Sequence, residues 1–128
     1  MAVANIQETL LMYTRQKASI NSDISDVMFD MLSATASTAD SQAMYNSEMQ
    51  SLYSSYYTDY PDLYLYEVEI LEDEHELELA NLNYWEQELE LELNNLETQL
   101  NEISTFEDTW TTMLQTNIQN DFTYGGAQ

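Results

Sequence analysis

The residues best suited to chemistry are one histidine and two glutamates, placed where two helices would meet. Glu72 and His75 lie three residues apart, which puts both side chains on one face of a helix. Glu48 falls roughly opposite them if the chain folds back on itself near its middle. Carboxylate and imidazole groups together bind divalent metals, so Glu48, Glu72 and His75 are the candidate metal ligands.

The spacing of Glu72 and His75 is the one with which some helical bundles present ligands to two iron ions. Such a centre needs four glutamates and two histidines, so a symmetric dimer would have to complete it. The competing interpretation is that polar residues at these positions only set the register between helices. Because a Glu-x-x-His match arises easily among 24 acidic residues, we expect no metal and no cofactor.

The composition also argues against the common catalytic arrangements. The only glycines are Gly125 and Gly126 near the end of the chain, which excludes a glycine-rich phosphate loop and an EF-hand. His75 is the only histidine, and nothing near it resembles a nucleophile elbow. There is no cysteine, so disulfides and thiolate chemistry are excluded. We therefore expect that the protein is not an enzyme.

The charge balance restricts the partners. Arg15 and Lys17 are the only basic residues, and the net charge is −22. Nucleic acids and anionic membranes need a basic footprint and are excluded as partners. The expected partners are further copies of the chain, a basic protein, or divalent cations acting as counter-ions. Seventeen of the 24 acidic residues lie in 61–128, whose outer face is either simply solvated or available to a basic partner.

Helix breakers divide the chain into two halves. Pro61 is the only proline, which leaves two uninterrupted stretches of more than 50 residues. Stretches of that length are typical of coiled coils. We predict an all-α fold, a single antiparallel helical hairpin over residues 1–128. Its helices should span about 4–57 and 64–119, with a turn centred on Pro61 at about 58–63 and a frayed tail at 120–128.

Both halves repeat their seam residues at alternating intervals of three and four, the spacing of a left-handed coiled coil. Glutamate stands at four of these positions, and at two of them, Glu86 and Glu107, the preceding residue is aromatic. The aromatic residues before them, Trp85 and Phe106, suggest that the apolar stripe shifts sideways there. The predicted seam positions of the first half are Val3, Ile6, Leu10, Tyr13, Lys17, Ile20, Ile24, Val27, Met31, Ala34, Thr38, Ser41, Tyr45, Glu48 and Leu52. Those of the second half are Glu72, His75, Leu79, Leu82, Glu86, Leu89, Leu93, Leu96, Leu100, Ile103, Glu107, Trp110 and Leu114.

Three segments need separate treatment. Residues 34–41 are small or polar at the seam positions, so the seam should be thin or loose there. Residues 64–70 and 88–93 alternate with a period of two, as strands do. For 88–93 the longer heptad pattern and the good helix formers Leu and Glu favour a helix. For 64–70 a strand remains an alternative to the helix.

A cluster of tyrosines surrounds Pro61. One interpretation is that these side chains pack over the turn and cover the end of the seam. The other is an adhesive tip or a contact between subunits, because tyrosine is favoured at interfaces. The cluster comprises Tyr53, Tyr56, Tyr57, Tyr60, Tyr64 and Tyr66.

The chain resembles small exported helical proteins, namely flagellin termini, type III secretion needle subunits and the WXG100 class. The shared features are a polar N-terminal helix over 1–50, the absence of cysteine and a mid-chain turn with Pro61 and Asp62. Glu86 and Gln87 follow Trp85, so the Trp-x-Gly turn is missing and the resemblance transfers no residue roles. It implies export to the cell surface without a cleaved signal peptide, and the cytoplasm is the alternative location.

Long helices with narrow apolar seams suit assembly better than catalysis. Our leading hypothesis is a structural, self-assembling protein, the subunit of a helical filament or cell-surface appendage. The alternative is a discrete acidic coiled-coil adaptor or export chaperone that binds a basic partner. The residues expected to carry assembly are Ile6, Leu10, Ile20, Ile24, Val27, Met31, Leu82, Leu89, Leu93, Leu96, Leu100, Ile103 and Trp110.

Overall fold

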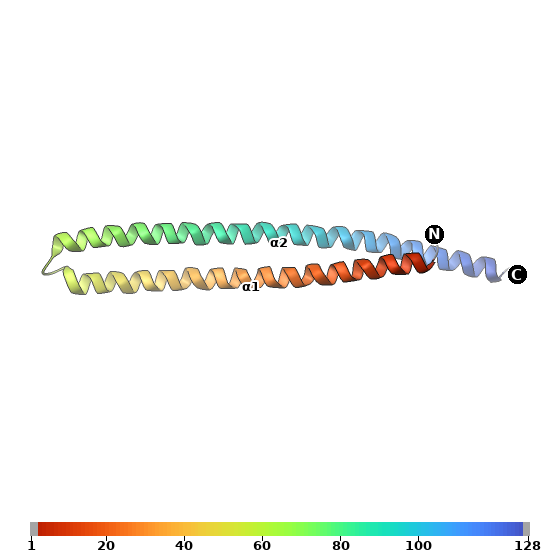
Figure 1. The fold of residues 1–128 in the computed structure, drawn as a ribbon, viewed down its shortest axis with the longest axis horizontal. Coiled ribbons are helices and arrows are strands. Elements are labelled where there is room, and N and C mark those ends of the chain that lie inside the picture. The colour runs from red at the N-terminus through yellow and green to blue at the C-terminus, as the bar shows by residue number, and fades with distance from the viewer. Residues whose placement is uncertain (1–2, 127–128) are drawn as a thin grey trace. The chain divides into compact units, whose positions relative to one another are not determined.

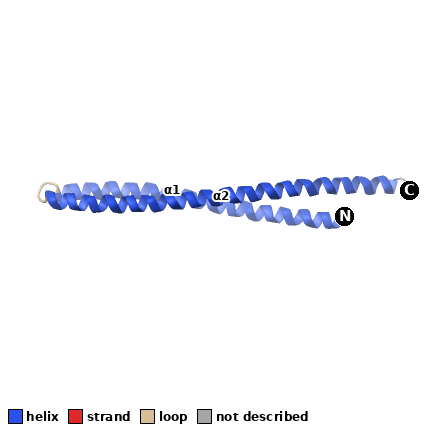
Figure 2. Cartoon of the chain, turned by 90° about the horizontal axis from the view of Figure 1, so that it is seen from above, coloured by secondary structure: helices blue, strands red, loops and turns tan. Residues whose placement is uncertain are grey.

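The computed structural model describes residues 3–126 of the chain, with side chains over 3–120. It contains two α-helices: α1 spans Val3–Tyr56 and α2 spans Pro61–Gly126. The two helices pack against each other as a hairpin (Figure 1). Every described residue outside the short connection is helical (Figure 2). The predicted all-α helical hairpin is therefore confirmed.

The chain divides into two compact units, and each unit contains one segment of α1 and one segment of α2. The terminal unit comprises residues 1–27 and 92–128, and the turn unit comprises residues 28–91. Within the turn unit, Thr38 contacts Glu86, and Tyr53 contacts Tyr64. Residue numbers rise along α1 as they fall along α2, which is the antiparallel pairing that a short turn imposes.

The turn is shorter than the sequence predicted. α1 ends at Tyr56, and α2 already begins at Pro61 instead of near residue 64. The Tyr64 backbone N–H donates to the Tyr60 carbonyl at 2.9 Å and closes the first turn of α2. Proline is favoured at the first helical position, because the N–H that it lacks would be unpaired there. Asp62 in this first turn complements the helix dipole. The prediction treated Pro61 only as the end of the preceding helix.

The C-terminal boundary also differs from the expectation. α2 continues to Gly126, so residues 120–126 are helical where we expected a frayed tail. No proline or glycine interrupts the chain between Pro61 and Gly125, and the helix therefore has no breaker at residue 119. Residues 127–128 of the expected tail lie outside the described residues.

The two segments with alternating sequences are helical. Residues 64–70 belong to α2, so the strand alternative for this segment is wrong, and residues 88–93 are helical as predicted. Tyr64, Val68 and Leu71 follow a spacing of three and four within the first segment, and all three are half-buried. This helical face outweighs the local alternation, because a helix needs no pairing partner for its backbone hydrogen bonds.

Candidate functional site

The seam of the terminal unit contains three of the five buried apolar side chains among the described residues. Ile6 is fully buried, and Ile20 and Val27 are more than nine-tenths buried. The facing residues of α2 are half-buried, because one neighbouring helix covers only part of each side chain. The residues of this unit that were predicted to carry assembly thus pack between α1 and α2 of the same chain. They are Ile6, Leu10, Ile20, Ile24 and Val27 on α1, and Leu93, Leu96, Leu100, Ile103 and Trp110 on α2.

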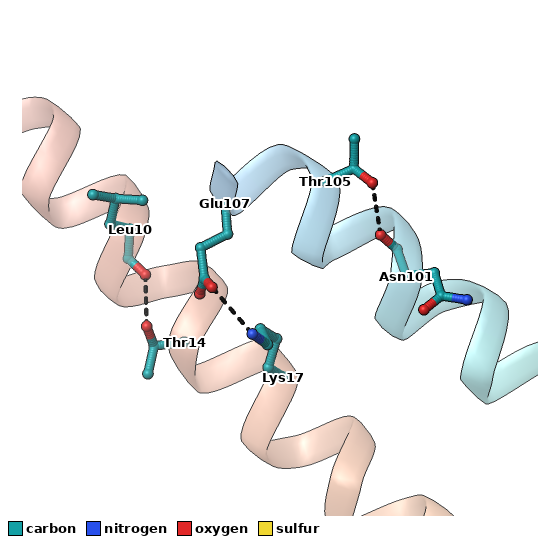
Figure 3. Close-up of polar contacts among 6 residues, drawn as sticks. All are labelled: Leu10, Thr14, Lys17, Asn101, Thr105 and Glu107. Carbon is teal, nitrogen blue, oxygen red and sulfur yellow. Dashed lines mark hydrogen bonds and ion pairs between the residues drawn. The ribbon is translucent and has the colours of Figure 1, made fainter. Parts of the chain in front are cut away.

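One ion pair crosses this seam. The Lys17 Nζ donates to Oε1 of Glu107 at 3.0 Å, and the two side chains are 31% and 25% exposed. Figure 3 shows the two side chains reaching toward each other from α1 and α2. Phe106 stacks with Tyr13 but stays 52% exposed. Glu107 thus keeps the seam position and is neutralised there, and Phe106 beside it makes an apolar contact with the seam residue Tyr13.

The seam of the turn unit is narrower and more polar. Ala34 is fully buried and Leu89 is 5% exposed, whereas Met31 and Leu82 are half-buried. These are the remaining predicted assembly residues and their neighbours, and they too lie on the seam within one chain. The small side chain of Ala34 fits a close approach of the two helices.

Polar residues also occupy seam positions in the turn unit, without a basic partner in the described part of the chain. The Thr38 hydroxyl shares its one proton between the Ala34 carbonyl at 3.0 Å and the Glu86 carboxylate at 3.3 Å, and Trp85 is 36% exposed. Glu86 keeps the seam position, and about two thirds of the neighbouring Trp85 is covered. Ser41 is 5% exposed, and its Oγ has no hydrogen-bond partner among the described residues.

The alternating intervals of three and four residues between seam positions are interrupted beside His75. The buried or half-buried residues run 41, 45, 49 and 52 on α1 and 71, 75, 79 and 82 on α2, with two successive intervals of four in each helix. Glu48 and Glu72, which the heptad places on the seam, are exposed, and Met49 and Leu71 take their places. The step puts an apolar side chain in the contact and leaves each carboxylate in water, where its charge costs nothing. Insertions of this kind relax a coiled coil locally.

His75 has protein partners of its own. Its ring stacks on Tyr45, with centroids 4.1 Å apart and planes 10° apart, and its Nε2 lies 3.1 Å from the Gln42 Oε1. His75 and Glu48 line one pocket of about 140 Å³, but Glu72 does not line it. Over the described part of the chain, no group of three or more metal-ligating side chains comes together. The structure therefore does not assemble the three candidate ligands, because the step in the repeat turns Glu72 outward.

The tyrosine cluster packs around the turn. Tyr53 and Tyr57 stack with centroids 4.5 Å apart, and the Tyr64 ring meets both edge-on at 6.1 and 5.4 Å. Tyr56 meets Tyr60 edge-on at 6.4 Å. These contacts tie the end of α1 to the start of α2. Half or more of the side-chain surface stays exposed on Tyr53, Tyr57, Tyr60 and Tyr66.

Apolar side chains also point away from the seam, which the sequence analysis did not anticipate. On α1, Phe29 and Leu32 are 69% and 70% exposed. On α2, Leu77, Tyr84 and Leu91 are 62% to 65% exposed and stand seven residues apart. A search for a second heptad repeat, offset from the first, would have found both groups. The turn unit therefore has apolar residues on both sides of each helix.

The outward tyrosine of α2 interacts with a carboxylate one turn later. The Glu88 carboxylate, through hydrogen bonding and its negative charge, raises the pKa of the exposed Tyr84 above its ordinary value of 10.0. The surroundings of Tyr84 thus favour its protonated, neutral phenol.

Neither family models, nor curated proteins, nor solved structures give a significant match to this chain. None of the described helices combines the length and the hydropathy that a membrane span requires.

Proposed function

We propose that this protein is structural and assembles with copies of itself, as the subunit of a helical filament or cell-surface appendage. The observation that carries the proposal is the balance of apolar side chains over residues 3–120. Five apolar side chains are buried, whereas nineteen large hydrophobic ones are exposed. Contiguous exposed apolar patches mark contact faces, and the exposed Leu77, Tyr84 and Leu91 share one face of α2.

The total accessible surface supports the same proposal. The chain exposes 9333 Å². A compact globular protein of 14.9 kDa is expected to expose roughly 7000 Å². Two paired helices have no interior beyond their seam, so further burial requires a neighbouring chain.

The net charge sets the conditions for such an assembly. With 24 acidic residues, the copies repel one another at low ionic strength. Salt screens this repulsion over about 8 Å at physiological ionic strength. Divalent cations neutralise carboxylates more strongly, and calcium prefers oxygen ligands. Assembly should therefore increase with salt and with calcium.

The first test is the absolute mass of the purified protein by size exclusion with light scattering at neutral pH, with and without calcium. A heterogeneous mass far above a tetramer, or growth on adding calcium, supports the filament, and electron microscopy then gives its helical symmetry. A monomer under all conditions contradicts the proposal. Prolonged incubation at high concentration and physiological salt guards against slow assembly.

A second candidate function is favoured by the uneven acidity. α2 carries most of the acidic residues, and this fits an adaptor or export chaperone that holds a basic partner. In this case the mass experiment should give a sharp dimer or tetramer that calcium does not change. A basic partner should then bind with an affinity that falls steeply with salt.

A further inference from the structure

The side of α1 that faces away from the seam carries a continuous uncharged stripe within the turn unit. Residues 29, 36 and 43 are seven apart, as are 32 and 39, and alternating steps of three and four place them on one face. Every member is exposed, Phe29 and Leu32 by about two thirds of their surface. The α1 outer stripe comprises Met28, Phe29, Leu32, Ala36, Ala39 and Ala43.

We propose that the α1 outer stripe binds the same stripe of a second copy, antiparallel and centred on Ala36. This inference rests on the proposed self-assembly and names the contact by which it begins. It also replaces the heptad residues as the assembly surface, because those residues are already occupied by the contact between α1 and α2.

The distribution of charge favours a second copy on this stripe. Over residues 28–43, α1 contains only two acidic residues: Asp30 lies off the stripe, and Asp40, four residues after Ala36 and three before Ala43, borders it. The α2 segment of the turn unit, residues 61–91, contains eleven. A contact through α1 brings one carboxylate of each chain, that of Asp40, to its edge, and it places the two α2 helices on opposite outer sides. The axes of the two α2 helices are then three interhelical distances of 8–10 Å apart, a total of roughly 25 Å. This separation is well beyond the length over which physiological salt screens charges.

The order of large and small residues along the stripe favours the antiparallel direction. With Ala36 on the symmetry axis, Phe29 of one copy lies level with Ala43 of the second, and Leu32 lies level with Asp40, one residue beyond Ala39. Phe29, the largest side chain of the stripe, is thus received by a small one, as close packing requires. A parallel pair would place Phe29 against Phe29 and leave a gap between the alanines.

The contact is modest in size and closes on itself. The stripe covers sixteen residues, about 24 Å of helix, so the buried area lies at the lower end of protein interfaces. Dimerisation through it should depend on concentration. An isologous contact forms a dimer and cannot alone form a filament, so the dimer is the unit from which further growth proceeds.

A matched pair of variants tests the contact by sedimentation velocity over a range of concentrations. Leu32→Glu places a charge in the stripe, and Leu77→Glu places the same charge on α2 at a residue of nearly equal exposure, 65% against 70%. We expect Leu32→Glu to weaken self-association at least about tenfold, because the charge would be buried against the second copy, and Leu77→Glu to leave it within about twofold. Circular dichroism checks that both variants keep their helix content.

The outcomes separate this inference from the proposed function. If both variants behave alike, or Leu77→Glu has the larger effect, the inference is overturned while self-assembly stands. A wild-type protein that stays monomeric overturns both. A wild-type protein that stops at a sharp dimer, lost in Leu32→Glu, upholds the contact and contradicts the filament.

Disulfide cross-linking tests the direction, since the chain contains no cysteine. Ala36→Cys alone should form a disulfide-linked dimer on mild oxidation. Phe29→Cys mixed with Ala43→Cys should cross-link in the mixture but not separately, because a disulfide needs Cα atoms within about 7 Å. Cross-linking of Phe29→Cys with itself would show a parallel pair and overturn the antiparallel contact.

Discussion

Lys17 and Glu107 are 90 residues apart in the chain, yet their side chains meet across the seam with the Nζ and Oε1 atoms 3.0 Å apart. Both side chains are less than one third exposed. A shift of one helix by a turn would leave both charges half-buried without a partner. The pair therefore helps to set the register of the terminal unit, the role that polar seam residues have in coiled coils.

Removing one member of this pair should destabilise the hairpin. Lys17→Met keeps the length of the side chain but leaves the Glu107 carboxylate half-buried and unpaired. We expect the free energy of unfolding to fall by about 1 kcal/mol, a value kept low because water still reaches both side chains. Urea denaturation of Lys17→Met, Glu107→Met and the double variant measures the coupling. Additive effects of the two single variants would show that the pair contributes no interaction energy.

Two leucines on α2 should respond very differently to truncation. Leu89 is 5% exposed on the seam, and Leu91 is 64% exposed on the outer side two residues later. We expect Leu89→Ala to lower the free energy of unfolding by about 2–3 kcal/mol, because it leaves a cavity between the helices. Leu91→Ala should change it by less than about 0.5 kcal/mol. Thermal and urea unfolding at low protein concentration compares them, and equal effects would contradict the assignment of the seam.

The ionisation of Tyr84 should depend on Glu88. Because its pKa is raised in the folded chain, Tyr84 stays neutral at pH values where an ordinary tyrosine ionises. The hydrogen bond to Glu88 therefore contributes stability at neutral pH that is lost as the pH rises through the raised pKa. Carbon NMR of ring-labelled tyrosine, assigned with Tyr84→Phe, follows the titration. Glu88→Gln should move the pKa of Tyr84 back toward 10.0, and an unchanged titration would refute the interaction.

Divalent cations should act on this protein without using Glu72. Glu72 is exposed and does not share the pocket lined by Glu48 and His75. We therefore expect Glu72→Gln to leave zinc and calcium binding, measured by calorimetry, within about twofold of the wild type. Glu74→Gln, which removes one charge from a side chain that lines that pocket, is the matched comparison. A loss of zinc binding specific to Glu72→Gln would restore the ligand set suggested by the sequence.

The spacing of residues along the chain was enough to predict most of the contact between the helices. All predicted seam positions except Glu48 and Glu72 are buried or half-buried. A repeat of three and four keeps side chains on one face of any α-helix, so the pattern predicts that face without knowledge of the partner. The same spacing could not place the step at His75, because a shift of one residue is decided by which side chain the facing helix accepts.

The sequence by itself determined the class of this protein, two helices joined near Pro61 with a narrow apolar seam and a strong negative charge. Only the tertiary structure decided what the seam and the outer faces are for. It paired Lys17 with Glu107 and exposed the Glu72 side chain to solvent. It also packed the heptad leucines between α1 and α2 of the same chain. It thereby left Phe29 and Leu32 uncovered, since a helix with apolar residues on two sides can bury only one of them against a single neighbour.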